Sequence, residues 1–185
     1  MTQTELYKEL NYVNHSRKKR QYYANLVIKQ PELIPLLLDI LSKTDDKLSA
    51  RAAWVLEFLC KEHLNKFTPY IDVFLPLLHR VKIDSALRPC AKICEYMADA
   101  YFGKEPHRLK QTLIPNQKET IIEACFDWMI TEQKVAVKAY SMHILFLFGK
   151  EFDWIYPELR VILERDFHEQ SAAFKARSRH ILKKI

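Results

Sequence analysis

Apolar residues recur at intervals of three and four positions along most of the chain, a spacing that places side chains on one face of an α-helix. Two examples are the proline-marked segments PELIPLLLDIL at 31–41 and PYIDVFLPLLHRV at 69–81. No segment alternates apolar and polar residues between turn residues, as a half-buried strand would. The pattern therefore predicts an all-α fold.

The same pattern predicts about ten helices. Two helices come first, near 4–13 and 16–28. The residues from Thr2 to Glu5 have the Thr-x-x-Glu form of a capping box at the start of the first helix. Gly103 and Gly149 follow helix ends, where a left-handed residue is common, so we expect that conformation at both. Four pairs follow, each of a first helix A and a second helix B: 31–42 with 46–62, 68–81 with 84–102, 115–130 with 133–148, and 155–166 with 169–184.

An internal repeat links these pairs. Three segments end alike, in FLCKE, YFGKE and LFGKE, and their lysines Lys61, Lys104 and Lys150 are spaced by 43 and 46 residues. That spacing is typical of two-helix repeats. A basic residue also recurs near the start of each B helix, four to six residues after an acid. The bases are Arg51, Arg88, Lys138 and Lys175, and the acids are Asp46, Asp84, Glu132 and Glu169.

Proline early in helix A, then an acid, then a base one turn into helix B resembles the HEAT-repeat family over about residues 31–185. The resemblance implies a HEAT/armadillo-like right-handed α-α superhelix, an α-solenoid, with A helices on the convex side and B helices on the concave side. It implies one domain spanning 1–185, with residues 1–30 as lead-in helices. It also implies a structural ladder between repeats. The ladder residues are Asp46, Asp84, Arg88, Lys138 and Lys175, with Arg51 as their first basic counterpart.

Some residues break the pattern of the repeat. When the B helices are aligned on their basic residue, Glu57 and Glu95 fall in columns that are otherwise apolar, and Trp54 stands where the others have Ala or Ser. Such departures mark sites of function or of compensation. A buried carboxylate needs a cationic partner. We therefore expect Glu57 to pair with Arg51 and Glu95 with Arg88, and a purely structural role for both pairs is the main alternative.

One face of the first B helix combines basic and aromatic residues. A helix advances 100° per residue, so five residues lie within about 80° of one another on this face: Lys47, Arg51, Trp54, Phe58 and Lys61. Bases interleaved with aromatics suit the binding of phosphate or carboxylate groups, although packing between repeats is the alternative for Trp54. The candidate binding residues are Lys47, Arg51, Trp54, Glu57, Phe58, Lys61, Arg88 and Glu95.

Composition narrows the function classes. The 185 residues are 49% apolar, which excludes disorder, and the two glycines exclude a glycine-rich phosphate loop. The net charge of +6 is concentrated in Arg17–Arg20 and in Lys175–Ile185, which hints at an acidic partner. No apolar run approaches the roughly 20 residues of a membrane span and the first ten residues lack a signal-peptide core, so we expect a cytoplasmic protein with no membrane partner.

The four cysteines lie in apolar helical patterns. Cys90 and Cys94 have the i,i+4 spacing of half a zinc site, but no second pair of ligands completes it. We therefore expect no metal and no cofactor.

The leading hypothesis is a non-enzymatic scaffold that presents a concave helical surface to a protein or peptide. The alternative is a DNA-binding protein resembling the DNA alkylation repair glycosylases, favoured by Arg51, Trp54 and Glu57 and by the basic tail. No catalytic residue is predicted, because no motif of that family matches. The chain also resembles short bacterial chains called adenylosuccinate lyases. We reject that activity because the Ser-Ser-x-Met-Pro-x-Lys-x-Asn signature loop is absent and the chain is less than half the length that fold needs.

Overall fold

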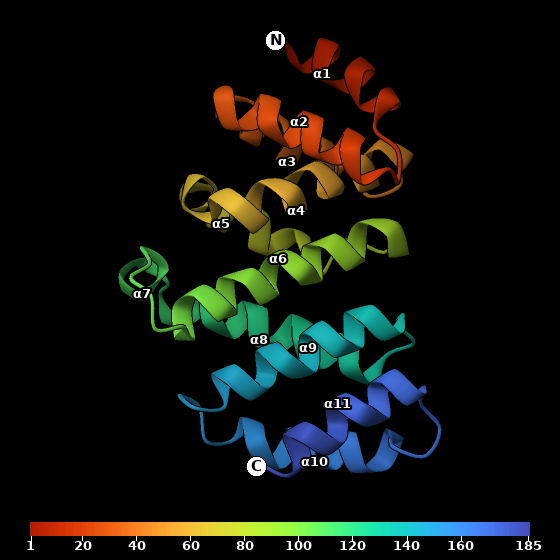
Figure 1. The fold of residues 1–185 in the computed structure, drawn as a ribbon, viewed down its shortest axis with the longest axis vertical. Coiled ribbons are helices and arrows are strands. Elements are labelled where there is room, and N and C mark those ends of the chain that lie inside the picture. The colour runs from red at the N-terminus through yellow and green to blue at the C-terminus, as the bar shows by residue number, and fades with distance from the viewer.

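The computed structural model describes residues 1–185 and is built of helices alone. Helices hold 76% of the residues and there is no strand, which confirms the predicted all-α class. The chain begins with α1 (Gln3–Glu9) and the 3₁₀-helix η1 (Leu10–Tyr12) (Figure 1). The remaining elements are α2 (Arg17–Lys29), α3 (Leu33–Ser42), α4 (Lys47–Phe67), η2 (Thr68–Tyr70), α5 (Ile71–Phe74), η3 (Leu75–Leu77), α6 (Asp84–Phe102), α7 (Leu109–Thr112), α8 (Pro115–Ile130), α9 (Val135–Phe148), α10 (Ile155–Asp166) and α11 (Ala172–Leu182).

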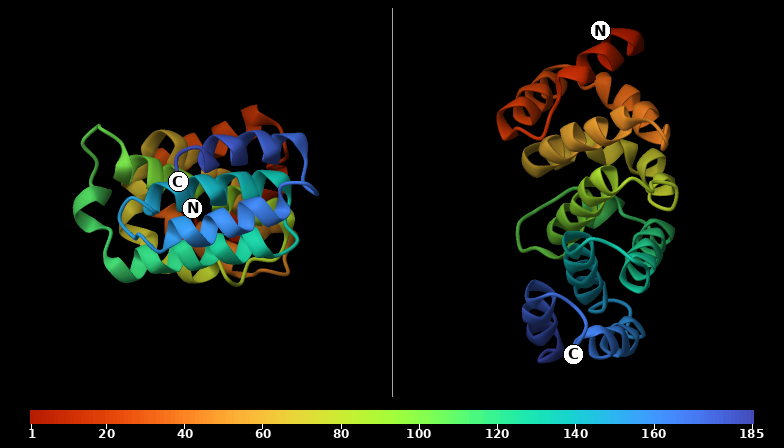
Figure 2. Two further views of the ribbon diagram at one scale, coloured as in Figure 1. Left: turned by 90° about the horizontal axis from the view of Figure 1, so that it is seen from below. Right: turned by 90° about the vertical axis from the view of Figure 1, so that its right-hand side faces the viewer.

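The helices stack in chain order along the long axis of the molecule, with the N-terminus at one end and the C-terminus at the other (Figure 1). They lie in two layers (Figure 2). The first, here called the α4 layer, contains α2, α4, α6, α9 and α11, each in contact with the next. The second, here called the α8 layer, contains α3, the segment from η2 to η3, α8 and α10. The expected A and B helices therefore lie in separate layers.

The space between the layers is filled by one cluster of 57 buried apolar residues. Its largest fully buried side chains include Phe67, Phe74, Phe148 and Phe174, which are distributed from the middle of the stack to its C-terminal end. Burial of apolar surface at every level holds the stack together.

The helix expected over 68–81 is broken, which corrects the sequence prediction. The segment divides into η2, α5 and η3, with Pro69 inside η2 and Pro76 inside η3. Proline lacks a backbone N–H and clashes with the carbonyl of the residue four positions earlier, so a continuous α-helix is disfavoured here. By contrast, α4 runs five residues beyond its expected end, through a kink at His63 (φ −136°, ψ 45°).

The two glycines do not have the expected left-handed conformation. The φ angle is −65° at Gly103 and −60° at Gly149, so that prediction was wrong. Gly149 is instead required by close packing, because a Cβ atom there would lie 2.1 Å from the ring of Tyr156. The predicted capping box is confirmed: Glu5 N donates to Thr2 Oγ1 at 3.3 Å, and Thr2 N donates to Glu5 Oε2 at 2.7 Å.

Candidate binding face

The first ladder residues lie at the start of α4, but they do not bind each other. Asp46 caps the helix, since its side chain accepts a hydrogen bond from Leu48 N at 2.8 Å and another from the Tyr7 hydroxyl. Arg51 donates to the backbone carbonyls of Leu10 at 3.1 Å and Asn11 at 2.7 Å. Arg51 therefore fastens the lead-in helices to α4 and is not the partner of Glu57.

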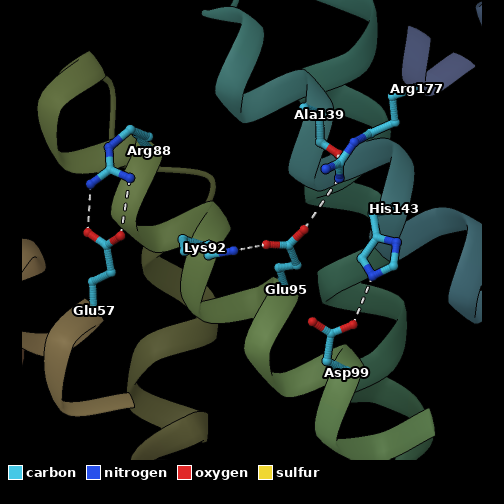
Figure 3. A network of polar contacts seen from close by, with 8 residues as sticks. All are labelled: Glu57, Arg88, Lys92, Glu95, Asp99, Ala139, His143 and Arg177. Atoms are coloured by element: carbon cyan, nitrogen blue, oxygen red, sulfur yellow. Dashed lines mark hydrogen bonds and ion pairs between the residues drawn. The ribbon is translucent and has the colours of Figure 1, made fainter. Parts of the chain in front are cut away.

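Glu57 pairs with Arg88 of the next helix in the α4 layer (Figure 3). Two parallel hydrogen bonds join them, Nη1 to Oε1 at 3.1 Å and Nη2 to Oε2 at 2.6 Å. Glu57 is 7% exposed, and such burial requires this compensation. Burial would lower the pKa of Arg88, but the bonds to Glu57 outweigh it and raise that pKa. The expected pairs Arg51–Glu57 and Arg88–Glu95 were therefore wrong, because α4 and α6 pack with Arg88 opposite Glu57.

Glu95 extends this polar network toward the C-terminal end. It is buried in α6, accepts a hydrogen bond from Lys92, and lies 3.6 Å from Nη1 of Arg177 on α11. The same Arg177 nitrogen donates to the carbonyl of Ala139 at 3.1 Å. One turn further along α6, Asp99 is 2.8 Å from Nε2 of His143 (Figure 3). Ion pairs and hydrogen bonds thus connect α4, α6, α9 and α11.

The other ladder residues also have partners different from those predicted. Asp84 lies 3.5 Å from Nζ of Lys134 and not against Arg88. Lys138 donates to the carbonyl of Met129, at the end of α8, at 2.9 Å, and its Nζ lies 4.0 Å from Oδ2 of Asp166, at the end of α10. Lys175 makes no side-chain hydrogen bond or ion pair. Arg51 and Lys138 thus bind the carbonyls of neighbouring helices, and of the four bases only Lys138 and Arg88 pair with an acid of a neighbouring repeat, so the ladder is not regular.

Trp54 joins two helices. It is partly buried against the core, and its Nε1 donates to the carbonyl of Ser85 at 2.7 Å. The Arg20 guanidinium lies over its ring at 5.8 Å and over the ring of Phe58 at 4.8 Å. Lys47 and Lys61 are exposed at opposite ends of the stripe. The predicted stripe is therefore divided, with its middle used for packing.

The exposed part of the face near Phe58 is a cavity of about 420 Å³ between α2, α4 and α6. Four cationic side chains line it, against the single carboxylate of Glu57. Arg88 neutralises Glu57 and Lys61 lies 4.0 Å from Oε1 of Glu62, so two positive charges, those of Arg17 and Arg20, are uncompensated. The basic run of Arg17–Arg20 is evident in the sequence but its place in the fold is not, and no sequence pattern predicted Tyr96 at this site. The lining residues are Arg17, Arg20, Glu57, Phe58, Lys61, Arg88 and Tyr96.

The face has few groups suited to catalysis. Glu57 is held by two hydrogen bonds, so it is not free to act as a general base. All four cysteines are buried, and burial raises the pKa of Cys90 to about 12, so its thiol stays protonated and weakly nucleophilic. No group of three or more His, Cys, Asp or Glu side chains is arranged to hold a metal ion. No helix combines the length and apolar character that crossing a membrane requires.

The chain matches no protein-family model, no curated protein and no solved structure. Its function is therefore inferred from its own geometry.

Proposed function

We propose that the chain is a non-enzymatic binding protein, a HEAT-like right-handed α-solenoid that presents its α4 layer to an acidic protein or peptide. The observation that carries the proposal is the excess of positive charge at the cavity between α2, α4 and α6. Arg17 and Arg20 line it without a carboxylate to neutralise them, and Lys61, which lies 4.0 Å from Oε1 of Glu62, adds a third cation. An arrangement of this kind attracts an acidic group and raises the rate of its association.

The stacking of helix pairs supports the solenoid. Helices α3 and α4, α8 and α9, and α10 and α11 are adjacent partners, and the α4 layer joins each level to the next. In repeat proteins of this design, each repeat contacts only the repeats next to it, and one long face is left open to partners. In the proposed superhelix the α4 layer is the concave side.

The polar network supports binding over catalysis. Glu57, Glu95 and Asp99 each have a partner on a neighbouring side chain or helix, so the face is held in one arrangement before a partner arrives. Prior ordering of this kind lowers the entropy lost on binding. It holds Glu57 and Glu95 in ion pairs, so neither is free for proton transfer, which also argues against adenylosuccinate lyase activity.

An acidic protein segment fits the face better than a continuous phosphate backbone does. Positive charge is in excess around the cavity, but the exposed carboxylate of Asp99 lies on the same layer, toward α9. A strand of nucleic acid running along the layer would approach this carboxylate, whereas a peptide can place an acidic group in the cavity and neutral groups elsewhere.

DNA binding of the kind seen in DNA alkylation repair glycosylases is the second candidate. It is favoured by the cavity between α2, α4 and α6, which is lined by four cations and by two aromatic residues, Phe58 and Tyr96. It would give an affinity that falls steeply with salt, because phosphate contacts release counterions.

A pull-down from native lysate, run with and without nuclease, separates the two candidates. We expect a protein to be captured whether or not nuclease is present, and to be lost with Lys61→Glu at the cavity. The matched control is Lys82→Glu, another exposed lysine, in the turn between η3 and α6. Capture that disappears with nuclease would favour the DNA-binding alternative. Capture unaffected by Lys61→Glu would contradict the proposed face.

A further inference from the structure

Arg20 differs from the other partly buried arginines. Arg88 has Glu57, Arg160 has Glu164, and Arg51 has two carbonyls. Arg20 has no carboxylate within 4.0 Å, and one hydrogen bond, from Nη2 to the carbonyl of His15 at 2.9 Å. Its Nε is buried without an acceptor. A guanidinium has five N–H donors in a planar fork, so most of the hydrogen-bonding capacity of Arg20 is unused.

The position of Arg20 is fixed by neighbours that leave its charge in place. The ring of Phe58, 4.8 Å away, and that of Trp54, 5.8 Å away, hold the guanidinium by cation–π contacts. Burial lowers the pKa of Arg20, Glu57 opposes this, and the nearby Arg88 and Arg17 lower it further. The guanidinium is thus ordered, partly desolvated and surrounded by excess positive charge. A bound anion would compensate this charge.

We infer that the cavity between α2, α4 and α6 receives a phosphoryl group carried by the partner protein, with Arg20 as its main ligand and Arg17 and Lys61 as supporting cations. The inference rests on the proposed function and names the chemical group that the site recognises. A phosphorylated side chain carries about −1.5 to −2 charges and three strong acceptor oxygens. It matches the two uncompensated cations, Arg17 and Arg20, better than the single charge of a carboxylate does. The planar fork of arginine suits such oxygens.

Nuclear magnetic resonance of the full chain tests the site directly, through the Nε–Hε resonance of Arg20. The probe is N-acetyl-O-phosphoserine amide, compared with N-acetyl-glutamate amide and with a short single-stranded oligonucleotide. We expect the phosphoserine probe to move the Arg20 resonance saturably and to bind at least tenfold more tightly than the glutamate probe. Arg20→Gln and Arg20→Lys should each weaken binding at least tenfold, as followed in these variants at the indole Nε1–H resonance of Trp54, whose ring lies against residue 20. The matched control is Arg108→Gln, which removes an exposed arginine that has no ion pair and should leave binding unchanged.

Arg20→Lys keeps the charge, so it serves as the decisive variant if Arg20→Gln melts at a lower temperature than the wild type. Equal affinity for the phosphoserine and glutamate probes would overturn the inference in favour of simple charge attraction. Tighter binding of the oligonucleotide at Arg20 would overturn it in favour of nucleic acid. The absence of a saturable shift at Arg20 would also overturn it.

Treatment of the captured partner with a phosphatase separates failure of this inference from failure of the proposed function. We expect dephosphorylation to abolish capture. Capture that survives phosphatase but is lost with Lys61→Glu would leave the binding face standing and remove the phosphoryl group. Capture insensitive to both would contradict the two proposals together.

Discussion

The junction of α4 with α6 contains a buried ion pair, whereas the junction of α9 with α11 contains none. At the first, long polar side chains reach across, as Glu57 does to Arg88 and Trp54 to the carbonyl of Ser85. At the second, the positions equivalent to Trp54 are Ser141 and Ser178, both fully buried. Ser141 donates within its own helix, to the carbonyl of Val137 at 3.0 Å. Arg177 of α11 does cross to α9, but it binds the backbone carbonyl of Ala139 and not a side chain.

In the proposed function, this difference accounts for a binding site at one end of the fold. Small residues such as Ser141 and Ser178 bring no charge to a junction. Large charged residues hold helices together and also leave neighbouring charges, such as Arg20, unneutralised. The N-terminal half therefore carries the candidate site, and the C-terminal half mainly extends the stack.

The largest expected effect comes from breaking the ion pair of the α4–α6 junction. Arg88→Met would leave the buried carboxylate of Glu57 without a partner, at a cost of about 3 kcal/mol in the free energy of unfolding. Urea denaturation measures the loss. The double variant Glu57→Leu/Arg88→Met should recover most of it, because an apolar pair needs no charge compensation. A single variant as stable as the wild type would mean that this pair does not hold the junction.

Close approach in the C-terminal half is tested at Gly149. A Cβ atom added there would collide with the ring of Tyr156, so Gly149→Ala should lower the free energy of unfolding by about 2 kcal/mol. Tyr156→Leu in the same chain should make the alanine better tolerated, and a double-mutant cycle measures this coupling. Additive effects of the two changes would show that the contact does not limit the packing.

The tryptophans of the two halves give a smaller, matched contrast. Trp54→Phe removes the hydrogen bond to Ser85 and should cost about 1 kcal/mol. Trp154 is 53% exposed and stacks on Phe126, so Trp154→Phe keeps an aromatic contact and should change stability by less than about 0.5 kcal/mol. Thermal melts of the two variants check which of them loses more stability. A larger loss with Trp154→Phe than with Trp54→Phe would contradict the role given to the Trp54 hydrogen bond.

The smallest effect is a tyrosine that ionises late. Burial, and then the negative charges of Glu57 and Glu95, raises the pKa of Tyr96 to about 12. Since an unfolded tyrosine ionises near pH 10, Tyr96 stabilises the fold below that pH, and its contribution is lost as the pH rises from about 10 toward 12. An absorbance titration of Tyr96→Phe subtracted from that of the wild type should show a midpoint near 12. A midpoint near 10 would place Tyr96 in solvent.

The helices could be predicted largely from the sequence, because their apolar spacing is local information. The segment 115–130 coincides with α8, and the capping box of Thr2 and Glu5 forms as expected. The broken helix at 68–81 was also marked in the sequence, by Pro69 and Pro76. The apolar spacing of this segment predicts one continuous helix, whereas its two prolines disfavour one.

The candidate site could be predicted only in part. The repeat alignment identified Glu57 and Glu95 as exceptional, and both are buried and paired. Their partners depend on how neighbouring helices are aligned. The apolar spacing within a single helix contains no information about that alignment. The place of Arg20 over Phe58 depends likewise on the packing of α2 against α4. The basic run of Arg17–Arg20 was therefore visible, but its role was not.

The most direct test of the account compares charge reversal at the two ends of the α4 layer, with binding of the captured partner as the measurement. One variant is Arg17→Glu/Lys61→Glu, at the cavity of the N-terminal half. The other is Arg179→Glu/Lys183→Glu, which reverses two exposed charges on and just after α11. The account predicts that the first variant loses at least tenfold in affinity and that the second binds as the wild type does. Loss of binding in the second variant alone would contradict it.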